Sequence, residues 1–320
     1  MSTVLVLAET TPTGVRKATL ELLTAAATLG TPVALVCGDA APEVFATLGH
    51  YGATTVYAVS APEFDEFLSL PKAEALVALS RQLSPTAILV TSSPEGKDIA
   101  ARVAVRLDAG IITDAVSLGR DGDAVTATQS IVSGSYHATS RVSRGIPVIT
   151  MRPNATAAVA APVSPTVETL AVTFSEPARG AAITDRAAKA ASGRPDLADA
   201  AIVVAGGRGV GSEEGFGVIG RLADALGGAV GATRAVTDLH WAEHNIQVGQ
   251  TGKTVAPSLY LAAGVSGAIQ HRAGMQSSKT IVAVNKDPKA PIFAIADFGV
   301  VGDLHAVLPS LIDEITARKA

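Results

Sequence analysis

Only one cysteine, Cys37, is present among 320 residues, so no disulfide can form within the chain. Aromatic residues are also scarce, with seven Phe, four Tyr and one Trp. Lys and Arg number 25 against 29 Asp and Glu, so the net charge is −4 and no basic excess is available to track nucleic-acid phosphates. No uninterrupted apolar run approaches the roughly 18 residues that suggest a membrane span. These scarcities exclude a disulfide scaffold and argue against a nucleic-acid-binding or membrane-spanning protein.

Alanine, valine and glycine are abundant instead, and 48% of the residues are hydrophobic while 17% are charged. This mixture suits parallel strands covered closely by helices, and 320 residues is about the length of two ordinary domains. The amino terminus has no basic segment, and its apolar run VLVLA stops at Glu9. We interpret this run as a first strand rather than a signal peptide, and we expect a cytoplasmic α/β protein.

The first half of the chain alternates apolar strands with amphipathic helices. Strands are expected at 4–8, 33–37, 54–59 and 87–91, and helices at 14–29, 71–83 and 97–107. After Asp114 the pattern changes to short alternating runs at 115–118, 125–132 and 135–142, followed by one more strand at 168–174. The pattern predicts a doubly wound domain with added β-strands.

A small, polar and charged segment at 178–199 separates this domain from a second one, and we place the boundary near Pro195. The predicted domains are therefore residues 1–194 and 195–320. The second begins with the buried strand AIVVAG, which runs into a glycine turn and a helix at 212–226. It ends in a helix at 303–316, for which Asp303 is a candidate cap. Together the patterns predict two Rossmann-like, doubly wound domains.

The most informative stretch is 259–285, LYLAAGVSGAIQHRAGMQSSKTIVAVN. It reads as a strand at 259–263, a glycine turn, the opening of a helix at 266–274, and a second strand at 279–284 that leads to Asn285. Free backbone N–H groups at a helix start favour an anion, and open α/β sheets bind ligands beyond the carboxyl ends of their strands. The stretch therefore predicts a site for a phosphate-bearing cofactor.

Two glycine motifs look like nucleotide-binding loops but fail the spacing that each requires. In GGRGVG (206–211) the third glycine of a dinucleotide fingerprint falls on Ser212 or Glu214. GKT (252–254) resembles the end of a Walker A loop, but Gln247 stands where that loop needs a glycine. Both motifs are therefore interpreted as turns, although Arg208 in the first turn is placed to reach a ligand at the same sheet edge.

The six histidines give no metal-binding pattern, and His240 and His244, four residues apart, share a predicted loop. Cys37 ends an apolar run where a small buried residue is expected, so we interpret it as structural. No acid–base pair for turnover of a small substrate stands out. We expect neither a metal site nor an enzyme with its own small-molecule substrate.

LYLAAGVSGAIQH (259–271), with Gly274 and AVN (283–285), resembles the signature of the electron-transfer flavoprotein alpha subunit. The resemblance extends upstream through VGQTGK (248–253) and GATR (231–234), and downstream through NKDP (285–288) and ADFG (296–299). It covers nearly the whole chain. The first domain shares TSSPEGKDIAAR (91–102) and GIITD (110–114), but a Ser-Gly-Gly phosphate loop is absent there, so we expect no nucleotide in that domain.

The resemblance implies that the second domain is an FAD-binding parallel sheet. Residues carried over to the cofactor are Arg208, Thr233, Arg234, Val248, Gly249, Gln250, Thr251, Ser266, Gly267, Ala268, Ile269, Gln270, His271, Asn285, Asp303 and Leu304. Three of them would tune the redox potential, with Arg234 over the flavin ring, Thr251 donating to flavin N5 and His271 beside the C2 carbonyl. The stretch 266–270 would hold the pyrophosphate and ribityl chain, and residues 285, 303 and 304 the ribose and adenine.

Two departures from the family pattern lie near the predicted ring. Thr233 stands where many relatives have serine, but the hydroxyl is retained. The segment DLHWAEH (238–244) differs from the usual Gly-Trp-Val-Pro-like loop, which leaves the local loop shape open.

The implied function is that of an electron carrier. The alpha subunit would pair with a smaller beta subunit that holds AMP, take electrons from acyl-CoA dehydrogenases of fatty acid β-oxidation and other flavin dehydrogenases, and pass them to a membrane quinone oxidoreductase. The residues alone leave two alternatives open. One is an adenine-nucleotide-binding regulatory module without a redox role, and the other is a catalytic flavin or nicotinamide dehydrogenase.

Overall fold

The computed structural model describes residues 2–11, 14–132, 134–186 and 193–319. The chain divides into two compact units, one of Met1–Ile131 with His137–Ala188 and the other of Val132–Tyr136 with Lys189–Ala320. Residues 187–192, within the predicted linker, lie outside the described residues. The predicted boundary at 194/195 stays a prediction.

The first unit is built on a nine-stranded sheet within the described part of the chain, in the order β11-β5-β4-β1-β6-β10-β7-β8-β9. The strands are β1 (Thr3–Ala8), β4 (Thr31–Cys37), β5 (Thr55–Val59), β6 (Ala87–Thr91), β7 (Ile111–Asp121), β8 (Ala124–Ile131), β9 (Tyr136–Arg141), β10 (Val148–Met151) and β11 (Thr166–Thr169). The pairs from β11 through β7 are parallel, and β8 joins β7 antiparallel. Two strands of two residues each, β2 (Thr10–Thr11) and β3 (Gly14–Val15), follow β1 and pair antiparallel.

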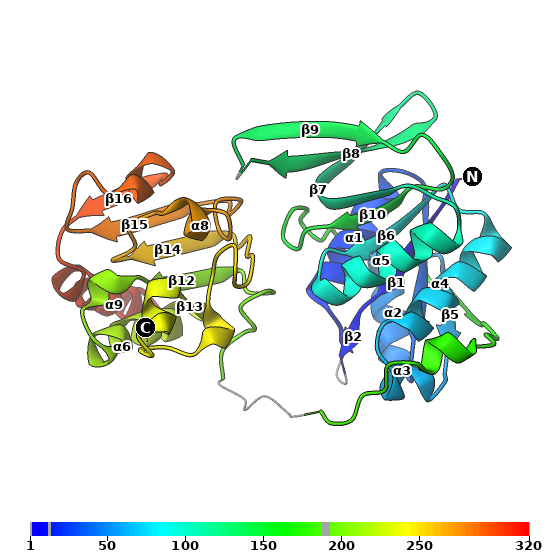
Figure 1. Cartoon of the computed structure of the whole chain (residues 1–320), viewed down its shortest axis with the longest axis horizontal. Helices are drawn as coiled ribbons and strands as arrows, with labels where there is room; N and C mark the ends of the chain where they lie inside the picture. The colour runs from blue at the N-terminus through cyan, green and yellow to red at the C-terminus, as the bar shows by residue number, and fades with distance from the viewer. Residues whose placement is uncertain (1, 12–13, 133, 187–192, 320) are drawn as a thin grey trace. The chain divides into compact units, whose positions relative to one another are not determined.

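Helices cover both faces of this sheet (Figure 1). Residues alternate along β1, so that Val4 and Val6 face one core while Leu5 and Leu7 face the other. The helices α1 (Lys17–Ala27) and α2 (Pro42–His50) pack on the first face, and α4 (Leu70–Leu83) and α5 (Pro94–Arg106) on the second. The short helices α3 (Glu63–Glu66) and η1 (Glu176–Arg179) add to the second core. The unit is therefore doubly wound, as the sequence predicts.

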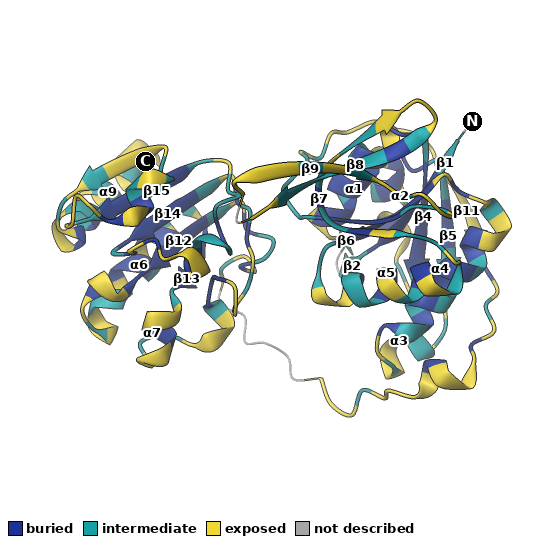
Figure 2. Ribbon diagram, turned by 45° about the horizontal axis from the view of Figure 1, so that its top comes forward, coloured by how far each residue is buried: buried dark blue, intermediate teal, exposed yellow. Residues whose placement is uncertain are grey.

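The added strands after Asp114 correspond to β7, β8 and β9, and β9 is mostly exposed (Figure 2). The strand expected at 168–174 is wrong in its bounds, because β11 covers only Thr166–Thr169. Leu170 and Phe174 are buried, so the apolar signal there came from core packing rather than from a strand. Helix α2 and strand β10 were not expected, since each is short and lacks a clear period.

The second unit contains a five-stranded, fully parallel sheet in the order β13-β12-β14-β15-β16 within the described residues. The strands are β12 (Ile202–Gly206), β13 (Ala229–Ala232), β14 (Leu259–Ala263), β15 (Ile281–Asn285) and β16 (Phe298–Val301). The helices are α6 (Glu213–Leu226), α7 (Arg234–Asp238), α8 (Ile269–Arg272) and α9 (Leu304–Lys319), with 3₁₀ turns η2 (Arg208–Val210), η3 (His244–Ile246) and η4 (Pro291–Ala294).

The two faces of this sheet are covered differently. Helices α6 and α9 pack on one face, where Leu222 and Leu308 are fully buried. Ser212 begins α6 by accepting the backbone N–H of Gly215 at 3.0 Å, and Gly227 ends it with φ 67°. The opposite face is covered by loop residues such as Val248 and Ile292. The loop containing Val248 therefore packs against this face of the sheet.

The predicted fold class, α/β with two Rossmann-like units, is confirmed. Cys37 is half-buried at the end of β4, and desolvation raises the pKa of its thiol to about 12, so the thiol is not a ready nucleophile. Among the described residues, no helix has both the length and the apolar character that crossing a membrane requires.

Candidate functional site

The carboxyl ends of the five parallel strands in the second unit lie along one edge of the sheet. From β12 the chain moves to β13 on one side and then, through β14, to β15 and β16 on the other. The order of strands therefore reverses between β12 and β14, and ligands of open α/β sheets bind in the crevice outside such a switch point. Every site residue predicted from sequence lies at or after the end of one of these strands or in the loop at 248–251.

Glycines let the two loops at the switch point approach each other closely. The backbone N–H of Gly209 donates to the carbonyl of Gly264 at 3.0 Å, and Gly207 donates to Ala263 at 2.9 Å. A Cβ at Gly207 would lie 2.3 Å from the Gly264 carbonyl oxygen, which no side chain tolerates. The glycine turn after β12 therefore serves close backbone packing, and it leaves Arg208 exposed at the crevice.

Thr233 and Arg234 follow β13 at the start of α7. The backbone N–H of Thr233 donates to the Gly206 carbonyl at 3.0 Å, which joins this turn to the end of β12. The hydroxyl of Thr233 is buried and has no hydrogen-bond partner among the described residues, so a ligand or a bound water would satisfy it. The Arg234 side chain is 68% exposed and its Nε lies 3.2 Å from an Asp238 carboxylate oxygen.

The loop at 248–251 is tied to both neighbouring parts of the site. Val248 N–H donates to the Ala232 carbonyl at 2.9 Å, and Gln250 N–H donates to the Gln270 carbonyl at 2.8 Å. Val248 and Gly249 are buried, whereas Gln250 and Thr251 are exposed. The loop therefore presents the Thr251 hydroxyl beside the turn after β13 and beside α8.

The stretch after β14 differs from the expected helix at 266–274. Helix α8 covers only Ile269–Arg272, so a long helix dipole is not available at its start. The preceding backbone N–H groups of Ser266, Gly267 and Ala268 have no hydrogen-bond partner within the described part of the chain. These loop N–H groups, rather than a helix dipole, are the donors that this stretch offers to a phosphate. Ile269 is 68% exposed and adds an apolar surface beside them.

His271 is buried, with 6% of its surface exposed, and both ring nitrogens already have partners. Nδ1 lies 3.0 Å from the carbonyl oxygen of Val248, and Nε2 lies 2.9 Å from the hydroxyl of Tyr260. A carbonyl only accepts, so Nδ1 carries the hydrogen and Tyr260 donates to Nε2 of the neutral ring. Desolvation lowers the pKa of His271 to about 4, which keeps the ring neutral. A contact with a flavin carbonyl would have to share one of these two bonds.

The last three predicted residues lie at the ends of β15 and β16. The Asn285 side chain donates to the Val265 carbonyl at 2.9 Å and accepts from Asp287 N–H at 3.0 Å, so it mainly shapes the turn. Asp303 is exposed and caps α9 by accepting the His305 N–H at 2.9 Å. Leu304 is 5% exposed within the core, so any ligand contact at this position falls to its backbone.

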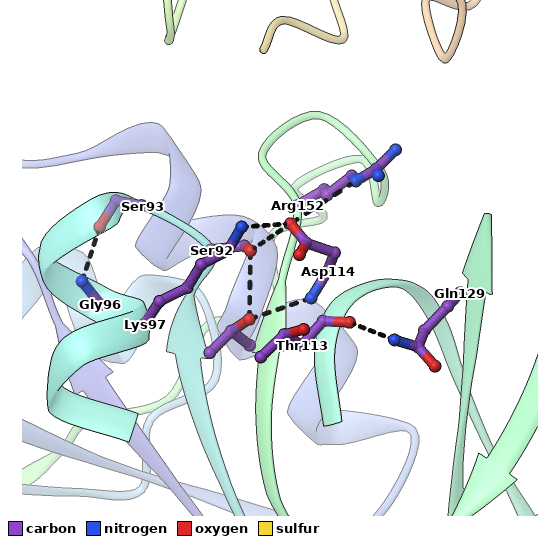
Figure 3. A network of polar contacts seen from close by, with 9 residues as sticks. Ser92, Ser93, Gly96, Lys97, Thr113, Asp114, Gln129 and Arg152 are labelled. Carbon is purple, nitrogen blue, oxygen red and sulfur yellow. Dashed lines mark hydrogen bonds and ion pairs between the residues drawn. The ribbon is translucent and has the colours of Figure 1, made fainter. Parts of the chain in front are cut away.

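A second polar cluster lies in the first unit, at the carboxyl ends of β6 and β10 (Figure 3). The Asp114 carboxylate receives hydrogen bonds of 2.8 Å from Ser92 and 2.8 Å from Lys97, while Arg152 Nε lies 3.9 Å away. Desolvation would raise the pKa of Asp114, but the bonds from Lys97 and Ser92 outweigh it and hold the pKa below its usual range. Asp114 adopts φ 57°, so this cluster holds an irregular backbone in place.

No group of three or more His, Cys, Asp or Glu side chains in the described ranges is arranged to hold a metal ion. In the Asp114 cluster the carboxylate is paired with Ser92 and Lys97, although the buried Nε of Arg152 has no hydrogen-bond partner among the described residues. The carboxyl edge of the second unit is different, because it combines an orphaned hydroxyl, unpaired loop N–H groups and an exposed arginine.

Comparison with known proteins bears on this edge directly. A family model described as "Electron transfer flavoprotein domain" matches residues 4–175, and one described as "Electron transfer flavoprotein FAD-binding domain" matches residues 196–276. The chain is 46% identical over 323 residues to electron transfer flavoprotein subunit alpha of Mycobacterium leprae (strain TN), with 100% of each chain covered. It is 39% identical over 318 residues to the subunit alpha of Bacillus subtilis (strain 168), with 97% of this chain and 96% of the relative covered.

The chain belongs to the electron transfer flavoprotein alpha-subunit family. Its second unit is a flavin-binding domain, and its role lies in electron transfer. Membership in an alpha-subunit family implies a different second subunit as partner. The resemblance read from the sequence motifs is therefore confirmed at the level of the family.

The residues present fit a bound flavin nucleotide. Among the described residues the buried Thr233 hydroxyl lacks a partner, and the N–H groups of Ser266, Gly267 and Ala268 are free to donate to an acceptor such as a phosphate. The exposed apolar side chain of Ile269 suits a ring or an apolar stem. A ligand with a phosphate end and a planar ring end matches these three features together.

Sequence reasoning missed two buried residues that hold the predicted site residues. Tyr260 is 0% exposed and bonds to His271, while Gln247 is 6% exposed and bonds to Thr251. Tyr260 was counted as part of an apolar strand, and Gln247 was noticed only as a residue that breaks a Walker A loop. Both residues have a polar side chain, stand next to a site motif and have an apolar residue on each side. This pattern was the signal that could have identified them.

Proposed function

We propose that this chain carries FAD at the carboxyl edge of its second unit and shuttles electrons on it as part of a heterodimer. The ring would lie against the loops that carry Arg234 and Thr251, and the pyrophosphate against residues 266–270. FAD supplies the redox chemistry when bound, because its ring accepts and releases electrons. The residues of this chain bind the cofactor, orient it and adjust the charge around it.

One observation supports this proposal above the others. Three backbone hydrogen bonds join four segments of the proposed cofactor site, from Thr233 to Gly206, from Val248 to Ala232 and from Gln250 to Gln270. Segments far apart in the sequence are thus held at one sheet edge. The matched FAD-binding family model covers all four of them.

Arg234 would supply the positive charge beside the ring. Its pairing with Asp238 is exposed on both sides, and such pairs on a helix are worth only about 0.3–0.5 kcal/mol. A charge-assisted hydrogen bond to a ligand contributes about 1.5–3 kcal/mol, so the guanidinium can leave Asp238 for the cofactor at a net gain. His271, being neutral, would act as a dipole and not as a second charge.

Thr251 would donate its hydroxyl to flavin N5, and the remaining predicted residues would complete the cofactor contacts. Arg208, Gln250, Gly249 and Val248 lie at the crevice or on its loop, and Asn285, Asp303 and the Leu304 backbone lie at the adenosine end. Each assignment comes from the family resemblance together with its position at the same edge. Residues 267 and 264 allow the loops to pack closely, since both are glycines with positive φ.

The proposal also covers the proteins that would bind this chain or exchange electrons with it. The partner would be a smaller beta subunit that holds AMP. Electrons would come from acyl-CoA dehydrogenases and other flavin dehydrogenases, and would pass to a membrane quinone oxidoreductase. The chain would thus be a carrier without a small-molecule substrate of its own. The cytoplasmic location stays a prediction.

Co-purification with the small subunit tests the cofactor assignment. The heterodimer is expected to be yellow, with flavin absorption bands and one releasable FAD. A colourless complex that binds only AMP or ATP would support the regulatory-module alternative and overturn the proposal. Reduction by an acyl-CoA dehydrogenase and its substrate, followed by re-oxidation with a quinone oxidoreductase, tests the carrier role.

A further inference from the structure

Gln247 lies directly before the loop at 248–251, and its side chain is buried between two threonines. The residue is 6% exposed. Its Oε1 accepts a hydrogen bond of 2.9 Å from the Thr237 hydroxyl, and its Nε2 donates one of 3.0 Å to the Thr251 hydroxyl oxygen. The backbone is fixed as well, because Lys253 N–H donates to the Gln247 carbonyl at 2.8 Å. The amide therefore has little freedom to move.

The direction of these bonds determines what the Thr251 hydroxyl can do. An amide NH₂ group only donates, so the Thr251 oxygen must accept from Gln247. A hydroxyl that accepts in this way keeps its own hydrogen for another acceptor. Since Thr251 is exposed, that acceptor lies outside the protein core. Thr251 is thereby made an outward hydrogen-bond donor.

The other end of the amide is held by Thr237, which is fully buried. The Thr237 hydroxyl lies 3.0 Å from the carbonyl of Arg234 as well as 2.9 Å from Gln247 Oε1. A hydroxyl has one hydrogen, so Thr237 donates it to Gln247 Oε1, and the Arg234 carbonyl is only a close neighbour. Two hydrogen bonds thus link Thr237, in the helix that Arg234 begins, through Gln247 to Thr251.

We infer that Gln247 is a positioning residue that presents the Thr251 hydroxyl as a hydrogen-bond donor to the flavin ring. The inference rests on the proposed function, in which Thr251 lies beside N5. The oxidised ring nitrogen has a lone pair and no hydrogen, so it accepts only from a group that donates. Such a bond strengthens as negative charge builds on the ring during reduction. Gln247 thereby favours one-electron-reduced FAD whose N5 carries no hydrogen over oxidised FAD, without contacting the cofactor.

The test compares the midpoint potential of bound FAD in four heterodimers: wild type, Gln247→Met, Thr251→Val and the double variant. Met keeps the length of Gln247 without its donor and without adding charge. Loss of the anchored donor is expected to reduce the preference for reduced FAD about two- to fourfold, which corresponds to about 18–36 mV for one electron. In the Thr251→Val background, Gln247→Met is expected to shift the potential by much less, because the residue acts through Thr251.

An amide turned the other way makes the opposite prediction. Thr251 would then donate inward to Oε1, so Gln247→Met would release its hydroxyl and raise the potential. A rise, or an equal shift in both backgrounds, overturns the inference. Thr251→Ser is the matched control, since it keeps the hydroxyl and should retain the wild-type potential.

The outcomes also separate this inference from the proposed function. A wild-type heterodimer without FAD would overturn both. If FAD binds but Thr251→Val leaves its potential unchanged, the assigned contact of Thr251 fails, and the inference fails with it. If Thr251→Val lowers the potential while Gln247→Met does not, only the role of Gln247 is overturned. Should Gln247→Met lose FAD, Gln247→Glu replaces it at a fixed pH: its charge shifts the potential in both backgrounds, but loss of the Thr251 donor should make the shift larger with Thr251 present than in the Thr251→Val background. Equal shifts overturn the inference.

Discussion

The hydroxyl of Tyr260 donates a 2.9 Å hydrogen bond to Nε2 of His271, and this pairing fixes the imidazole as a neutral ring. The carbonyl of Val248, 3.0 Å from Nδ1, fixes the position of the ring hydrogen. Protonation of Nε2 would force Tyr260 to accept, leaving its hydroxyl hydrogen in a fully buried place. Of the three residues assigned to redox tuning, Arg234 therefore carries the permanent charge and His271 does not.

Loss of the Tyr260 hydroxyl should destabilise the second unit. Tyr260→Phe leaves the Nε2 acceptor of His271 buried without a donor, which costs about 1–3 kcal/mol. Denaturant unfolding of the variant measures this loss. Tyr57→Phe in the first unit is the control, since that hydroxyl pairs with Glu168 on exposed β11 and its loss should cost less. Equal stability of Tyr260→Phe and wild type would contradict the assigned bond.

The neutral state of His271 predicts a pH dependence of stability. Desolvation lowers its pKa to about 4 in the folded protein, below the unfolded value of about 6.5. The unfolded chain therefore binds more protons between these values, so stability is complete above about pH 6.5 and falls as pH drops toward 4. The total effect is on the order of 3 kcal/mol. His271→Gln should remove this part of the slope, whereas exposed His244→Gln should retain it.

Arg234 and Asp238 should affect the bound flavin in opposite directions. Arg234→Ala removes the cation and should weaken FAD binding about 10- to 150-fold, the equivalent of one charge-assisted hydrogen bond. Asp238→Asn releases the guanidinium from its 3.2 Å partner and should raise the flavin potential by about 10–20 mV. Equilibrium dialysis and a redox titration measure the two effects. A fall in potential for Asp238→Asn would show that Arg234 does not face the ring.

Because the loops at the switch point pack closely, replacing a glycine by alanine should affect stability very differently at different positions. Gly207→Ala would bring a Cβ within 2.3 Å of the Gly264 carbonyl oxygen and should cost about 1–3 kcal/mol while weakening FAD binding. Gly217→Ala is a matched control on the exposed side of α6, where the nearest atom is 3.8 Å away at the tip of Arg221. It should stabilise the unit by up to about 1 kcal/mol. Thermal unfolding of both variants, with and without FAD, measures these differences.

The Asp114 cluster should stabilise the first unit without affecting the flavin. Desolvation opposes ionisation of Asp114, but its bonds to Lys97 and Ser92 prevail and lower the pKa. The cluster's contribution is therefore present above the unfolded carboxyl pKa and is lost as pH falls through the lower folded pKa. Lys97→Met should cost about 1 kcal/mol, because the carboxylate is only partly buried. FAD affinity should stay at the wild-type value.

Much of the fold followed from local patterns in the sequence. Apolar runs such as 4–8 and 259–263 gave strands within a residue of their bounds, because a buried parallel strand needs a continuous apolar run. Shorter elements could not be predicted from local patterns. Strand β10 lies between β6 and β7 although its four residues carry no distinctive period. Its place depends on pairing with distant strands, which no local window records.

The candidate site, too, followed partly from the sequence and partly from the tertiary structure. Motifs around Arg234, Thr251 and His271 identified the family and the loops that meet at one sheet edge, since parallel strands bring their carboxyl ends together wherever the sequence places them. Only the tertiary structure decided which atoms are free. It paired both nitrogens of His271, buried Leu304 in the core, left the Thr233 hydroxyl without a partner among the described residues and set Gln247 behind Thr251. Hydrogen-bond partners depend on distances between segments far apart in the chain, so sequence determined the residue types while packing decided their chemistry.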